Sequence, residues 1–280
     1  MSAQQPPATT LPQTLSGGTP SRHSLTRHET RAPRAFSVSR TLATALRVLR
    51  QLGHDPRTIA LMLVVPCLLL AVLSWVYDGK QRTFDQVGAS LLGIFPLILM
   101  FLVTSIATLR ERTSGTLERL LSMPLGKADL LGGYALAFGG VAVVQACLAT
   151  GLAVWGLGLD VVGSPWLLLV IALADAFLGI ALGLFVSAFA ASEFQAVQFM
   201  PAVLLPQLLM CGLLVPRDTM QPVLSAVSDV LPMSYAVDGM TQVLQHTGVT
   251  GDFVRDLAGV AACALLALAL GAATLRRRTA

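Results

Sequence analysis

The chain has 280 residues, of which 54% are apolar and 12% are charged, and its mean hydropathy is +0.71. Soluble domains are less apolar and carry about a quarter of their residues as charged side chains, so this composition excludes an ordinary soluble protein. It predicts an all-α, polytopic membrane protein. The net charge of +4 gives no reason to expect nucleic acid as a partner, because in a membrane protein the placement of positive charge matters more than its sum.

The N-terminal part divides into two segments. Residues 1–35 are rich in Pro, Thr, Ser, Gln and Arg and lack an apolar run, which predicts a disordered cytoplasmic tail. The first apolar stretch begins too late for a cleavable signal peptide. Residues 36–58 predict an amphipathic helix at the membrane interface, followed by a turn. Leucines recur there at helical spacing: Leu42, Leu46, Leu49 and Leu52.

Six apolar runs make up the expected transmembrane domain, residues 59–275. Five are long enough to span a bilayer, and a sixth is shorter, contains two prolines, and by itself is equally consistent with a re-entrant segment. Charge placement favours six spans, because most of the 19 basic residues then lie inside with both termini, including the basic tail 276–280. The expected spans are 59–77, 86–109, 130–155, 166–190, 194–215 and 257–275.

A charged segment, residues 110–125, separates the second and third expected spans. Ionised side chains and polar backbone do not remain in hydrocarbon, so this segment must face water or a water-soluble partner. Glu118 near the start of a short helix would complement the helix dipole, and Pro124 would end that helix. Three leucines, Leu117, Leu120 and Leu121, would form one apolar face. That face suits a cleft on a partner protein, although an ordinary helix in the lipid headgroups is the alternative.

Within the spans, Asp175 is the only acidic residue far from an end. A charge at mid-membrane costs about 2.5–3.5 kcal/mol on insertion scales, so the side chain should face protein or water. It either contacts substrate or a proton in a transport path, or holds helices together as a protonated or hydrogen-bonded carboxyl. Gln145 and Gln207 allow the same two interpretations. Gly179 and Gly183 form a Gly-x-x-x-Gly pattern that favours close helix packing.

Residues 216–256 should lie outside the cytoplasm. Two apolar stripes at helical spacing predict short amphipathic helices before the last span, with a folded external loop as the alternative. The first stripe contains Val223, Leu224, Val227, Val230 and Leu231, and the second contains Met240, Val243 and Leu244.

Several chemistries lack the residues they need. The four cysteines lie in four different apolar runs and the four histidines form no cluster, so no metal site and no catalytic residues are expected. The only lysines, Lys80 and Lys127, do not belong to a phosphate-binding Gly-rich loop. The chain is therefore expected to be a non-catalytic subunit without its own cofactor. If ATP drives it, another polypeptide must hydrolyse the nucleotide.

The order of an amphipathic helix, six spans and a charged segment after the second span resembles the permease subunits of ATP-binding-cassette type-2 (ABC-2) transporters. The likeness is strongest over residues 110–121 followed by Pro124, and residues 192–239 are similar to the daunorubicin/multidrug-exporter-like branch. It implies a second possible coupling contact at Glu193 and Gln195, for which a plain helix turn is the alternative. The implied ATPase-coupling residues are Arg110, Glu111, Arg112, Gly115, Thr116, Leu117, Glu118, Leu120 and Leu121.

The resemblance further implies two copies of a cytoplasmic ATPase that binds ATP and Mg²⁺, and a second permease copy or paralogue. The expected location is a bacterial plasma membrane, with both termini in the cytoplasm. The expected activity is export of a hydrophobic or amphipathic cargo such as a drug or antibiotic, with lipid or glycan-precursor export as the alternative. An ion-coupled secondary carrier is a further alternative, but Asp175 alone supplies little for binding a coupling ion.

Overall fold

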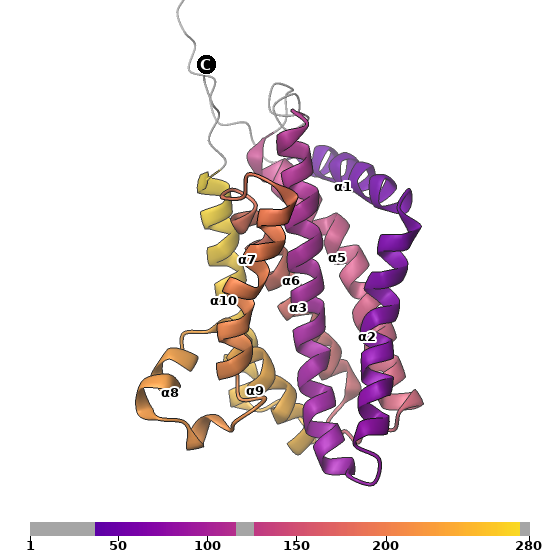
Figure 1. Ribbon diagram of the computed structural model, residues 1–280, viewed down its shortest axis with the longest axis vertical. Helices are drawn as coiled ribbons and strands as arrows, with labels where there is room; N and C mark the ends of the chain where they lie inside the picture. The colour runs from indigo at the N-terminus through magenta and orange to yellow at the C-terminus, as the bar shows by residue number, and fades with distance from the viewer. Residues whose placement is uncertain (1–36, 116–125, 275–280) are drawn as a thin grey trace, which may run out of the picture. The chain divides into compact units, whose positions relative to one another are not determined.

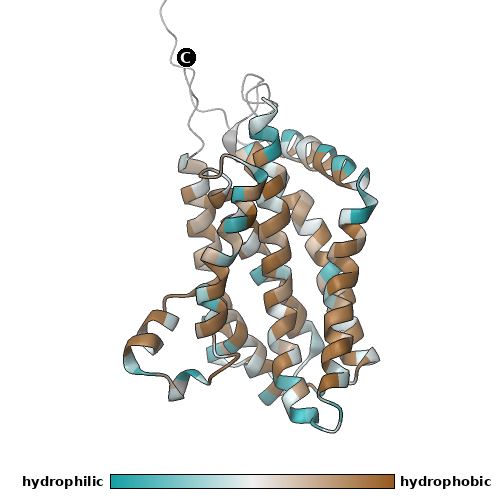
Figure 2. Ribbon diagram, viewed as in Figure 1, coloured by the Kyte–Doolittle hydropathy of each residue, from teal (hydrophilic) through white to brown (hydrophobic). Residues whose placement is uncertain are grey.

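The structure, a computed structural model, describes residues 37–115 and 126–274, and these form helices and turns without a strand (Figure 1). Among these residues, five helices are long and apolar enough to cross a membrane, and apolar residues cover most of their length (Figure 2). The predicted all-α polytopic fold is confirmed. These helices are α2 (Pro56–Val76), α3 (Gln81–Thr113), α5 (Lys127–Gly151) with its π-helical continuation η1 (Leu152–Gly156), α6 (Pro165–Val186) and α10 (Gly251–Thr274).

Helix α3 is longer than the second predicted span, which ended at residue 109. The helix continues to Thr113, and Gly115 then adopts a left-handed φ of 71°. A glycine at this position is a common helix terminator, since other residues meet their own Cβ there. The first charged residues of the segment at 110–125 therefore belong to the last turn of α3. Helix α6, in contrast, ends at Val186 rather than at residue 190.

The sixth predicted span corresponds to α7 (Glu193–Met210). Its glutamines and two internal prolines lower its hydropathy, and it is not among the five helices that composition alone marks as spanning. An α-helix of this length nevertheless rises about 27 Å, close to the thickness of a bilayer core. Helix α7 packs beside α3 and runs alongside part of its length (Figure 1). Six crossings remain a prediction.

Helix α1 (Val38–Gly53) forms where the amphipathic helix was predicted, and lies across one end of the bundle, which we call the α1 end (Figure 1). It packs on α5 through its small residues, while Leu42, Leu46 and Leu49 are 38–53% exposed. The leucine stripe is therefore turned away from the protein, as a helix contacting lipid requires. A Cβ added at Gly133 of α5 would lie 2.5 Å from Thr44 Cβ, so the contact with α1 depends on that glycine.

Helices α3 and α6 form the closest pair in the core. Glycine allows this approach because its missing side chain lets two backbones meet. A Cβ at Gly179 would lie 2.3 Å from the Leu97 carbonyl oxygen, and one at Gly183 would lie 2.6 Å from that of Phe101. The close packing expected from the Gly-x-x-x-Gly pattern is therefore present.

At the opposite end, two short helices precede α10, as predicted. After a 3-10 turn, η2 (Arg217–Thr219), the chain forms α8 (Pro222–Ser228) and α9 (Pro232–Gln245). The two helices differ in their surroundings. Helix α8 exposes apolar side chains such as Val223, which is 74% exposed, whereas α9 buries Met233 and Met240 against α3, α6 and α10. Only the first predicted stripe is thus left largely exposed.

Candidate functional site: the charged end of α3

Three consecutive charged residues, Arg110, Glu111 and Arg112, form the last turn of α3 at the α1 end. Successive side chains of an α-helix point about 100° apart, so these three reach different neighbours. All three belong to the predicted coupling segment. Its other predicted members Thr116, Leu117, Glu118, Leu120 and Leu121 lie outside the described residues.

Glu111 joins three helices. Its carboxylate accepts two hydrogen bonds from the guanidinium of Arg47 on α1, with Nη1–Oε1 at 2.8 Å and Nη2–Oε2 at 3.3 Å. The hydroxyl of Tyr134 on α5 donates to Oε2 as well. Glu111 is 8% exposed and Tyr134 1% exposed, so this charged group is largely removed from solvent and fully paired. A bidentate contact of this kind restrains the relative orientation of the two side chains and also neutralises their charges.

Arg110 reaches α7. Its guanidinium forms a fork with Glu193, with Nε–Oε1 at 2.7 Å and Nη2–Oε2 at 3.1 Å. The structure thus brings together two residues that the sequence placed in separate candidate contacts. Their side chains are 64% and 49% exposed, and an exposed pair of this kind contributes at most about 1 kcal/mol. The pair therefore links α7 to α3 but contributes little to the stability of the fold.

Two further contacts hold the turn between α6 and α7. Arg112 donates from Nη1 to the carbonyl oxygen of Ser187, the residue after α6. Gln195 is the other predicted second contact, and its side-chain Oε1 accepts from the backbone amide of Ala191 at 2.8 Å. The backbone amide of Gln195 donates to the Ser192 hydroxyl at 3.2 Å. Ser192 thus caps the start of α7, and Gln195 belongs to this capped first turn, as in an ordinary helix start. The end of α3 therefore contacts α1, α5, the end of α6 and the start of α7.

Asp129, near the start of α5, holds the other end of α1. The side chain is completely buried and accepts hydrogen bonds from the Ser37 amide at 2.8 Å and the Gly126 amide at 3.1 Å. It also lies 3.0 Å from Nε of Arg40. Helix α1 is consequently bound to α5 through the pair Arg40–Asp129 and to α3 through Arg47–Glu111. Sequence reasoning missed Asp129, Arg47 and Tyr134, although a tyrosine or aspartate at the edge of an apolar run signals a polar partner.

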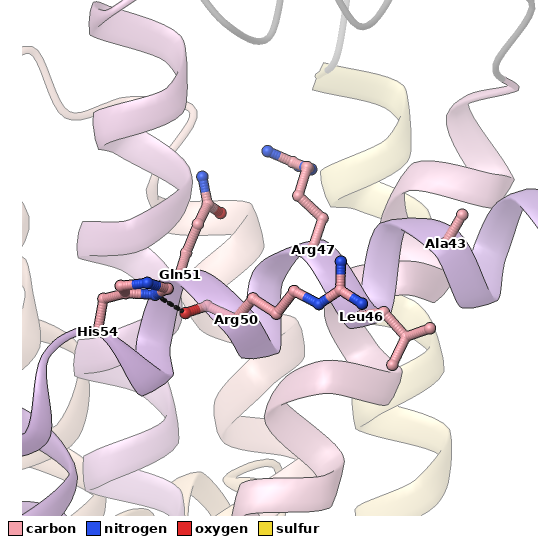
Figure 3. A pocket seen from close by; sticks show the side chains of 6 residues that line it. All are labelled: Ala43, Leu46, Arg47, Arg50, Gln51 and His54. Atoms are coloured by element: carbon pink, nitrogen blue, oxygen red, sulfur yellow. Dashed lines mark hydrogen bonds between the residues drawn. The ribbon is translucent and has the colours of Figure 1, made fainter.

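An open pocket of about 420 Å³ lies along the outer side of α1 (Figure 3). Its lining combines cationic and apolar side chains of one helix: Ala43, Leu46, Arg47, Arg50, Gln51 and His54. Nδ1 of His54 lies 2.5 Å from the Arg50 carbonyl oxygen, so the ring closes the last turn of α1. Because Arg47 lines this pocket and also binds Glu111, a partner on α1 would touch the α3 junction directly.

The intramembrane candidates lie elsewhere in the bundle. Gln207 is used within the protein: Nε2 donates to the Val203 carbonyl at 3.0 Å, and Oε1 accepts from the Met233 amide at 3.4 Å. Asp175 is completely buried, Gln145 is 1% exposed, and neither forms a side-chain hydrogen bond with any described residue. No hydrogen bond or ion pair between described residues joins these three to the charged end of α3. Nor do the described residues contain a group of three His, Cys, Asp or Glu suited to a metal ion.

Comparisons with known proteins identify the family of the chain. A family model described as ABC-2 type transporter matches residues 40–244. Over 60% of the chain, it is 25% identical to ABC transporter G family member 20 of Dictyostelium discoideum. Over 75% it is 23% identical to the Linearmycin resistance permease protein LnrN of Bacillus subtilis, and over 62% it is 26% identical to the Probable multidrug ABC transporter permease YbhR of Escherichia coli. The matches span 23%, 53% and 47% of these relatives, respectively.

Proposed function

The chain belongs to the ABC-2 type transporter family, and we propose that it is the permease subunit of an exporter driven by a separate ATPase. The observation that carries the proposal is the junction at the end of α3. There, three consecutive charged residues contact four other parts of the bundle. In this proposal the α1 end faces the cytoplasm, where the ATPase binds residues 110–125 and the surface of α1.

The mechanism follows from the stiffness of a long helix. Helix α3 is continuous from Gln81 to Thr113, so a force applied to its charged end is transmitted along its whole length. Through Glu111 the force also reaches α1 and α5, and through Arg110 it reaches α7. Closure of two ATPase subunits would thus move several spans as rigid bodies, which is how small changes at an effector site become domain motions.

The cargo class is proposed from the character of the spans and from the relatives. Apolar helices with few ionisable groups favour a hydrophobic or amphipathic molecule over a small ion. Two relatives carry the words linearmycin resistance and multidrug in their names, which supports drug or antibiotic export. Two ATPase copies, and a second permease copy or paralogue in a bacterial plasma membrane, complete the proposed assembly.

A charge exchange tests the role of the junction. The chain is co-purified with its ATPase, reconstituted into proteoliposomes, and assayed for ATP-driven uptake of a fluorescent lipophilic drug. Arg110→Glu and Glu193→Arg should each reduce uptake by up to about fivefold, as loss of a coupling free energy of about 1 kcal/mol would do. The double exchange, which restores an ion pair of reversed polarity, should recover most of the uptake.

The matched control is another exposed ion pair, Arg255–Asp252, at 3.1 Å and at the opposite end. Asp252→Arg should leave uptake unchanged. If no ATPase co-purifies after mild crosslinking, the exporter proposal is wrong. If the ATPase binds but the Arg110 and Glu193 variants transport normally, the role of the junction in coupling is wrong.

A further inference from the structure

The carboxyl group of Asp175 lies halfway along α6, and both of its oxygens are buried and lack a hydrogen-bond partner among the described residues. A carboxyl group that holds helices together would show such a bond, because the protonated form donates a hydrogen bond and the ionised form accepts several. The packing around Asp175 shows none. A buried polar group without a partner costs free energy, and an ionisable one within a membrane span points to function.

No described cation forms a hydrogen bond or an ion pair with Asp175. The arginines at the α8–α9 end are engaged elsewhere, with Arg217 bound by Asp229 and Asp238, and Arg255 bound by Asp252 and Asp256. Those at the charged end of α3 contact Glu193 and the Ser187 carbonyl. A positive group that reaches Asp175 would therefore not compete with a resident side chain.

Beside Asp175, a glycine and a flexible side chain cover the carboxyl group. A Cβ placed on Gly93 of α3 would lie 3.8 Å from Oδ2 of Asp175 and 3.3 Å from Cε of Met240 on α9. Gly93 thus keeps the α3 side of the carboxyl free of a side chain, while the tip of Met240 occupies the adjoining space. Methionine is unbranched and flexible, and repacks readily around ligands of different shape.

From these contacts we infer that Asp175 binds the positive group of a lipophilic cation during transport, after the side chain of Met240 has moved aside. The inference rests on the proposed export function and narrows its cargo to amphipathic amines, quaternary ammonium compounds and similar ions. The apolar body of such a molecule would lie among the α3, α6 and α9 side chains that surround the carboxyl. The cationic group would supply the partner that Asp175 lacks.

Direct binding to the purified full-length chain tests the inference without the ATPase. Equilibrium dialysis with radiolabelled tetraphenylphosphonium, a permanent lipophilic cation, should show saturable binding. Asp175→Asn should weaken it about tenfold or more, since a charge-assisted contact is lost. This variant keeps the shape of the side chain and removes no hydrogen bond seen in the structure, so it should fold normally. Asp175→Glu keeps the charge and should retain binding.

Asp256→Asn is the matched control, because it removes another buried aspartate, which is 1% exposed and bound by Arg255. Its binding should equal that of the unmodified chain. Equal binding by Asp175→Asn, or no saturable binding by the unmodified chain, overturns the inference. ATP-driven transport of the uncharged dye Nile red separates the two proposals. If Nile red is transported but cation binding does not depend on Asp175, the export function holds and the cation site is wrong. If cation binding depends on Asp175 but Nile red is not transported, the cation site holds and the export function is wrong.

Discussion

The tightest contact between α3 and α6 gives a prediction whose size follows from the structure. A Cβ at Gly179 would lie 2.3 Å from the Leu97 carbonyl oxygen, whereas ordinary contacts begin near 3.4 Å. In Gly179→Ala the two helices must therefore separate by about 1 Å, a gap that forfeits a quarter to a half of the dispersion energy of the facing atoms. Overpacking of this kind costs about 1–3 kcal/mol.

A second glycine supplies the control. Gly140, on α5, would place a Cβ with nothing within 4 Å. Both Gly→Ala changes gain the same helix propensity, about 1 kcal/mol, so the difference between the two variants isolates the packing cost. Gly179→Ala should be less stable than Gly140→Ala by about 1–3 kcal/mol, which corresponds to a midpoint lower by about 2–12 °C.

The assay is thermal unfolding in one detergent, followed by intrinsic fluorescence. Because membrane proteins commonly unfold irreversibly, all variants must be heated at one scan rate and compared as apparent midpoints. Gly183→Ala should behave like Gly179→Ala, since its Cβ would lie 2.6 Å from the Phe101 carbonyl oxygen. A midpoint for Gly179→Ala equal to or above that of Gly140→Ala would refute the assigned contact between α3 and α6.

Two further predictions concern the polar contacts at the two ends of the bundle. Glu111→Ala removes the acceptor of a buried Tyr134 hydroxyl, and should lower the free energy of unfolding by about 1–3 kcal/mol. Because α1 then detaches more readily, trypsin should cleave faster at Arg50. Tyr134→Phe leaves no unpaired donor and should have the smaller effect. Equal cleavage rates in the unmodified protein and both variants would contradict the role of Glu111 in holding α1 to α3 and α5. On α9, burial raises the pKa of Asp238 above its ordinary value of 3.8, although the neighbouring Arg217 lowers it. The folded protein therefore holds this proton more tightly than the unfolded chain, and its stability declines as pH rises from 3.8 through the raised pKa. Asp238→Asn lacks this decline, so its thermal unfolding midpoint should rise relative to that of the unmodified protein between acid and neutral pH. A difference between the two midpoints that stays constant with pH would contradict the raised pKa of Asp238.

The sequence predicted the features that depend on local pattern. Apolar runs and basic flanks located the long helices, and leucine spacing located α1, because burial in lipid acts on every turn of a helix. The prolines and glutamines of α7 blur the same signal, so the sixth crossing is less clear from composition. Helix α3 continues a turn beyond the end of the predicted span, because charged residues continue a helix as readily as they form a loop once they find partners.

The partners themselves were not predictable. Arg110 and Glu193 were both candidates, but their pairing depends on how α7 packs against α3, and 83 residues separate them. Arg47 and Tyr134 lie 64 and 23 residues from Glu111, and neither stands out within its own segment. Such contacts between distant segments arise from tertiary packing, which hydropathy and periodicity do not encode.

The two candidate sites are mechanically related through α3. Near its middle, Gly93 adjoins Asp175 of α6, and at its end Arg112 binds the Ser187 carbonyl just beyond α6. The glycine-mediated contact at Gly179 lies between these points, so α3 and α6 are tied along most of their shared length and should move as one body. A movement of the charged end of α3 therefore does not expose the carboxyl of Asp175 by separating α3 from α6. Opening on the α9 side, where Met240 is the flexible contact, would leave this pair intact. Under the two proposals, α9 is therefore the element whose displacement would link ATP hydrolysis to release of a cationic cargo.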